Sequence, residues 1–75
     1  MDDEALLLRI RVITVSTRAA VHSLGPDNPQ VPEVVERGRS LLNELAPAVK
    51  KHGNNQASEA LERAREQLEK LEPEG

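Results

Sequence analysis

The chain has 75 residues, a formal net charge of −3 at neutral pH, and no Cys, Trp, Tyr or Phe. This length indicates one small domain, and the lack of Cys excludes disulfides and thiolate metal sites. A net acidic chain without aromatic residues offers neither a basic surface for phosphates nor a platform for base stacking, so we do not expect a nucleic-acid partner.

The apolar residues are too scattered for a membrane protein. No apolar run reaches the roughly 18 residues of a membrane span, and the chain begins with Asp2, Asp3 and Glu4, the wrong charge for a signal peptide. We therefore expect a soluble protein that does not bind membranes. Its core must consist of Leu, Ile, Val and Ala side chains, which favours close packing of helix on helix.

Two turn-forming segments divide the chain, residues 25–29 ("GPDNP") and residues 52–55 ("HGNN"). A Gly after the last residue of an apolar pattern, with a Pro soon after it, is typical of a helix end, and Asn54 or Asn55 can cap the helix that follows. The pattern predicts an all-α fold in which residues 1–75 form one antiparallel, up-down-up three-helix bundle, with helices over residues 2–24, 32–52 and 55–72.

The first segment has apolar residues on two opposite sides of the predicted helix. The inner stripe, which we expect to face the other helices, consists of Leu6, Ile10, Ile13, Thr17, Ala20, Val21 and Leu24. The outer stripe extends over about 16 Å of helix and consists of Leu8, Val12, Val15 and Ala19, with His22 at its end.

A contiguous apolar row flanked by Arg is typical of an interaction surface. Because Arg11 and Arg18 flank the outer stripe, we predict that another protein binds there, through Leu8, Arg11, Val12, Val15, Arg18, Ala19 and His22. In one alternative the stripe packs inside the bundle. In another it pairs two copies of the chain into a six-helix homodimer.

The first segment is also rich in β-branched residues, which lower its helix propensity by roughly 3 kcal/mol in total. Residues 9–17, "RIRVITVST", therefore also suit a strand. One strand followed by two helices resembles the ribbon-helix-helix DNA-binding repressors, whose paired strands read the major groove. The resemblance covers about residues 8–52. The chain departs from that pattern in its short following helix at residues 17–24, its long connection at residues 25–31 and its acidic charge.

The second segment has a broad apolar face and two special residues. Pro32 suits a first helical position. Pro47 lies opposite the apolar face, where we expect it to kink the helix and where the alternative is that it ends the helix. Gly38 lies on the core side, where it allows another helix to approach. The apolar face consists of Val34, Val35, Gly38, Leu41, Leu42, Leu45, Ala48 and Val49.

The third segment is a one-sided amphipathic helix with no site of its own. Its apolar residues are Ala57, Ala60, Leu61, Ala64, Leu68 and Leu71, and most of the others are charged. One helix covers less than the usual 800 Å² or so per partner. We therefore expect edge residues of the second segment, Arg37 and Leu41, to add to the interaction surface.

Nothing in the sequence predicts an enzyme. In an antiparallel bundle His22 and His52 lie at opposite ends, so they should not share a metal or act as a catalytic pair. The chain has no Ser–His–acid pattern, Gly-rich phosphate loop or metal-ligand spacing. We predict no catalytic residue, no cofactor and no metal.

Two stretches, "VPEVVERGRSLLNELAPAVKKHG" and "SEALERAREQLEKLEPEG", resemble computationally designed helical miniproteins. Their short loops, their Glu-, Arg- and Lys-rich surfaces and their aliphatic core are typical of such proteins. The first segment departs from this style. It looks like a helix whose residues were chosen to fit a target surface. The resemblance implies a small binder of a receptor or other protein.

Overall fold

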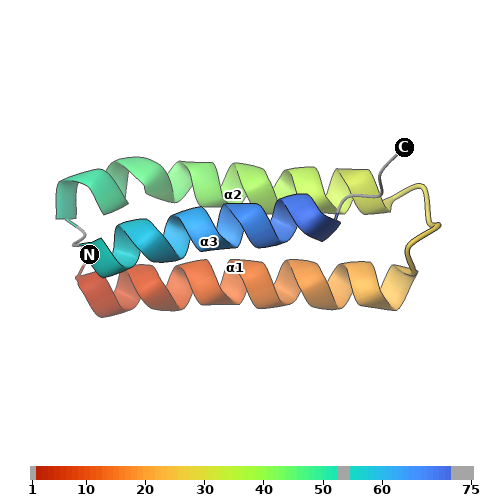
Figure 1. The fold of residues 1–75 in the computed structure, drawn as a ribbon, viewed down its shortest axis with the longest axis horizontal. Coiled ribbons are helices and arrows are strands. Elements are labelled where there is room, and N and C mark those ends of the chain that lie inside the picture. The colour runs from red at the N-terminus through yellow and green to blue at the C-terminus, as the bar shows by residue number, and fades with distance from the viewer. Residues whose placement is uncertain (1, 53–54, 72–75) are drawn as a thin grey trace.

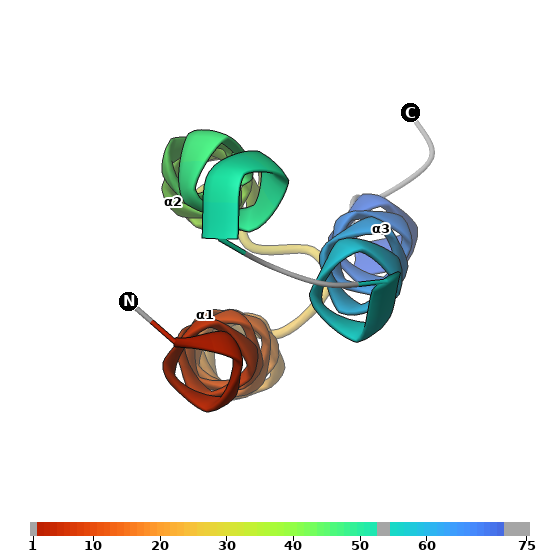
Figure 2. The same cartoon turned by 90° about the vertical axis from the view of Figure 1, so that its left-hand side faces the viewer.

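The computed structural model describes residues 2–52 and 55–71, which form three helices. These are α1 (Asp3–Leu24), α2 (Val31–His52) and α3 (Asn55–Leu71). They run up, down and up along an elongated bundle (Figure 1), and no strand occurs within the described residues. Seen along the bundle, the helices form a triangle in which each packs against the other two (Figure 2). The predicted all-α three-helix bundle is confirmed.

Helix α1 has well-defined signals at both ends. The Asp2 carboxylate caps its start by accepting a 2.8 Å hydrogen bond from the backbone N–H of Ala5. Gly25 ends it with φ of 90°, and the Gly25 N–H donates to the Val21 carbonyl at 2.9 Å. The alternative in which residues 9–17 form a strand is wrong, because all of them lie within α1.

The connection between α1 and α2 is closed by local hydrogen bonds. The Asn28 side-chain oxygen accepts from the Gln30 N–H at 2.8 Å, and the Asn28 carbonyl accepts from the Val31 N–H at 3.1 Å. Helix α2 therefore begins at Val31, one residue earlier than predicted. Val31 is fully buried. The sequence-based apolar face omitted it because Pro32 was taken as the helix start.

Helix α2 continues through Pro47 to His52, so the alternative in which Pro47 ends the helix is wrong. Pro47 is exposed, as its position opposite the apolar face predicts. It has no N–H to donate to the carbonyl of Asn43. The bend expected from this missing hydrogen bond stays a prediction. Residue 72 and Asn54, the predicted end and one predicted cap of the third helix, lie outside the described residues.

The core is aliphatic, as the composition requires. Its buried apolar side chains are Leu6, Ile10, Val21, Val31, Val35, Leu42, Leu45, Val49, Ala57, Leu61, Ala64 and Leu68. Two buried polar residues join them, Thr14 and Thr17. The hydroxyl of Thr14 donates to the Ile10 carbonyl within the same helix at 2.8 Å. This local bond satisfies the hydroxyl, so a residue not predicted for the inner stripe can be buried.

All three helices converge at Gly38. A Cβ atom on this residue would lie 2.5 Å from Oγ1 of Thr17 on α1 and 3.1 Å from Cδ1 of Leu68 on α3. Both separations are shorter than an ordinary van der Waals contact between heavy atoms. The missing side chain therefore lets the three helices approach, as predicted for a Gly on the core side.

We expect the substitution Gly38→Ala to lower the free energy of unfolding by up to about 2 kcal/mol. Ala gains about 1 kcal/mol of helix propensity, but overpacking against Thr17 and Leu68 typically costs about 1–3 kcal/mol. Urea denaturation followed by far-ultraviolet circular dichroism measures the difference. A Thr17→Ala background lacks Oγ1 and Cγ2, the two Thr17 atoms that a Cβ on residue 38 would meet. In that background Gly38→Ala should cost less stability. A gain of stability on Gly38→Ala alone would contradict the close approach.

Candidate protein-binding surface

The outer stripe predicted on the first helix lies on the surface of the bundle. Leu8 is 62% exposed, and Val12 and Val15 are each 54% exposed. Ala19 and His22 continue the row and are also exposed. The alternative in which this stripe packs inside the bundle is wrong, because the buried stripe of α1 lies on the opposite side, around Leu6, Ile10, Thr14, Thr17 and Val21.

The flanking Arg residues are exposed as well. Arg11 and Arg18 lie beside the apolar row with their side chains open to solvent. The structure therefore brings together all seven residues predicted from the sequence on one outward face. We call this set the α1 face: Leu8, Arg11, Val12, Val15, Arg18, Ala19 and His22.

A hollow of about 320 Å³ extends the N-terminal half of the α1 face toward α2. Leu8 and Val12 line it from α1, and the exposed side chain of Leu41 lines it from α2. Leu41 was predicted as an edge residue, and the structure places it beside the α1 face. Arg37 is exposed but does not line this hollow. Two residues of opposite charge, Arg9 and Glu44, also line it.

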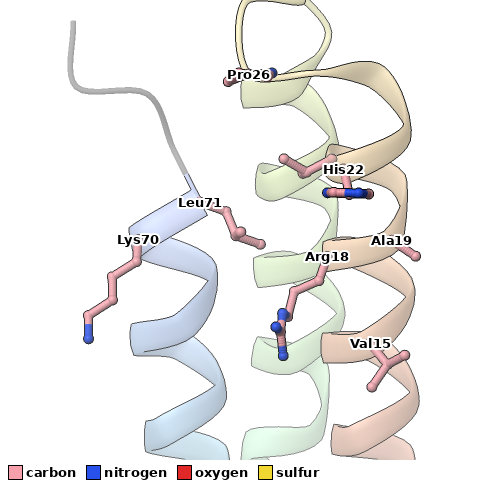
Figure 3. A pocket seen from close by; sticks show the side chains of 8 residues that line it. Val15, Arg18, Ala19, His22, Pro26, Lys70 and Leu71 are labelled. Atoms are coloured by element: carbon pink, nitrogen blue, oxygen red, sulfur yellow. The ribbon is translucent and has the colours of Figure 1, made fainter.

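A larger hollow of about 790 Å³ extends the C-terminal half of the α1 face toward α3. Arg18 extends from α1 toward α3, and Leu71 points toward α1 from the last turn of α3 (Figure 3). His22 also lines the hollow from α1. Lys70 lies at its outer edge and extends away from α1. The remaining lining residues are Val15, Ala19, Val21 and Pro26.

The sequence pattern does not indicate that α3 contributes to this hollow. It predicts no site on the third helix, but Lys70 and Leu71 line the larger hollow. Leu71 was predicted as a core residue, and it does pack partly against the core. Its second role depends on how the last turn of α3 lies beside α1, and the helix pattern alone does not give that arrangement.

The charge on the α1 face has one sign. From Ala5 to Pro26 the sequence contains three arginines and no Asp or Glu. The described residues that line the larger hollow include Arg18 and Lys70 but no carboxylate. The chain as a whole has a net charge of −3. The α1 face is thus a cationic and apolar surface on an acidic protein.

The histidines lie far from each other. His22 is in the last turn of α1 and His52 ends α2, at opposite ends of the bundle (Figure 1). Residues 2–52 and 55–71 contain no group of three or more His, Cys, Asp or Glu side chains that could hold a metal ion. Over the same residues, no helix combines the length and the apolar character that crossing a membrane requires.

Comparison of the chain with protein-family models, curated proteins and solved structures finds no match.

Because the α1 face is exposed, we expect the same substitution to Ala to change the free energy of unfolding very differently at two nearby leucines. Leu6→Ala removes a fully buried side chain and should lower the free energy of unfolding by about 2–5 kcal/mol. Leu8→Ala, at 62% exposure, should change it by less than about 0.5 kcal/mol. Urea denaturation of both variants gives the comparison. A large loss of stability in Leu8→Ala would mean that the α1 face is buried in the free protein.

Proposed function

We propose that this protein is a small, designed helical binder that recognises another protein through the α1 face. The observation that supports this is the row of exposed Leu8, Val12 and Val15 side chains between two hollows. Large apolar side chains scattered singly on a surface need no explanation. A contiguous row rimmed by Arg is the pattern of a surface that a partner covers.

The composition of α1 supports a binding role as well. Helix α3 consists largely of strong helix formers, whereas α1 carries many β-branched residues. Several of these do not serve the core, since Val12 and Val15 are exposed. A residue that lowers helix propensity without contributing to the core needs another explanation, and contact with a partner provides one.

The two hollows supply the area that one helix lacks. A helix segment from Leu8 to His22 is about 21 Å long, and a stable interface needs about 800 Å² on each partner. Leu41 widens the α1 face on the α2 side, and Leu71 widens it on the α3 side. We propose that Leu8, Val12 and Val15 are the apolar anchors. Arg11, Arg18 and His22 orient the partner from the rim.

The substitutions Val12→Glu and Val15→Glu should each weaken partner binding by at least about 30-fold while the bundle stays folded. A carboxylate placed among the apolar anchors is desolvated when the partner binds, and losing such an anchor costs about 2 kcal/mol or more. A panel of purified receptor ectodomains screened by biolayer interferometry supplies the partner. Calorimetry then confirms one-to-one binding, and circular dichroism confirms the fold of each variant.

Ser40→Glu is the matched control for these two variants. It adds the same carboxylate at an exposed position of α2 that lines neither hollow, so binding should be unchanged. Two results would contradict the proposed function. One is equal affinity of the wild type and both Val variants for every protein that binds. The other is equal weakening by the Ser40 control.

A further inference from the structure

The charge on the α1 face indicates the chemistry of its partner. We infer that the partner is an acidic amphipathic helix whose carboxylates lie against the hollow between α1 and α3. This inference rests on the proposed function and adds to it the sign and the position of the partner's charge.

The larger hollow provides the cationic side chains. Arg18 extends into it from α1, and Lys70 lies at its outer edge. The described lining residues contain no carboxylate that would pair with them. A guanidinium binds carboxylates with two parallel hydrogen bonds, which makes Arg18 well suited to an acidic side chain. Glu72 and Glu74 follow Leu71 in the sequence and lie outside the described residues.

The smaller hollow differs from the larger one in the charge of its lining, and this difference sets the orientation of the partner along α1. Its charged lining residues, Arg9 and Glu44, are of opposite sign, and its exposed apolar residues are Leu8, Val12 and Leu41. A partner therefore meets an apolar, charge-balanced region beside the N-terminal half of α1 and a cationic region beside the C-terminal half. We assign the partner's apolar residues to the first region and its carboxylates to the second.

A second copy of this chain fits the α1 face less well. A two-fold dimer pairs a surface with itself, so it would bring Arg11 and Arg18 of both copies to one interface. The sequence has no Asp or Glu from Ala5 to Pro26 to pair with these arginines across the contact. Glu44 is the one carboxylate among the described residues that line the two hollows, and it shares its hollow with Arg9. Like charges placed together at an interface oppose association. An acidic partner turns the same arginines into favourable contacts.

Two synthetic helical peptides of about 21 residues serve as probes. Both carry Leu at heptad positions a and d. One has Glu at positions e and g, and the other has Lys there. The affinities come from titrating isotope-labelled protein and following its backbone amide signals by two-dimensional NMR. We expect the Glu peptide to bind about tenfold tighter than the Lys peptide, with shifts at Arg18, His22 and Leu71. This difference should shrink near 1 M salt, where charges are screened within about 3 Å.

Charge reversal locates the interaction. Arg18→Glu and Lys70→Glu should each weaken binding of the Glu peptide by about three- to tenfold, the range expected when an attractive pair becomes repulsive. Lys50→Glu is the matched control, because Lys50 also lies exposed in the last turn of its helix but lines neither hollow. It should leave the affinity unchanged.

Each contrary outcome overturns the inference. Equal binding of the two peptides at the α1 face would reject the acidic partner and leave the proposed function standing. Amide shifts at the α1 face that depend on protein concentration without peptide would identify a second copy as the occupant. If neither peptide shifted Val12 or Val15, the acidic partner would be rejected, and the Val12→Glu and Val15→Glu test would decide the proposed function separately.

Discussion

The close approach of the three helices at Gly38 is the constraint on which this structure depends. The chain has no aromatic residue to fill a wide interior, so its helices must lie near one another to bury enough aliphatic surface. Gly38 makes this possible by leaving room for Thr17 and Leu68 in the space that a Cβ atom would occupy. The small buried residues Ala57 and Ala64 on α3 serve the same packing.

A core of this kind uses only one side of each helix. Helix α1 buries a stripe from Leu6 to Val21 against α2 and α3, and the chain has no further helix within residues 2–52 and 55–71 to cover its opposite side. The row from Leu8 to Val15 therefore stays exposed as a direct consequence of the three-helix arrangement. The inner stripe of α1 thus holds the bundle together, and the α1 face on the opposite side is the surface that we propose a partner binds.

The sequence predicted most of this arrangement because the helical periodicity of apolar residues is clear in the second and third segments, and because Gly and Pro mark the turn after the first segment. The outer stripe could be predicted because it lies opposite the inner one. Features that depend on tertiary placement were harder to predict. Val31 was missed because a Pro follows it, and Thr14 because its hydroxyl is satisfied within its own helix. The roles of Lys70 and Leu71 beside α1 follow from how two separate helix ends lie together, which no local pattern contains.

The α1 face is uncovered in the free protein. Light scattering after gel filtration tests this directly, with the protein loaded from micromolar to millimolar concentration. The protein is detected by refractive index because the chain has no Trp or Tyr. We expect a mass near 8.3 kDa at every loading, because nothing but solvent then covers the α1 face. A mass near twice that value would mean that the chain covers the α1 face with a second copy, and it would contradict the account.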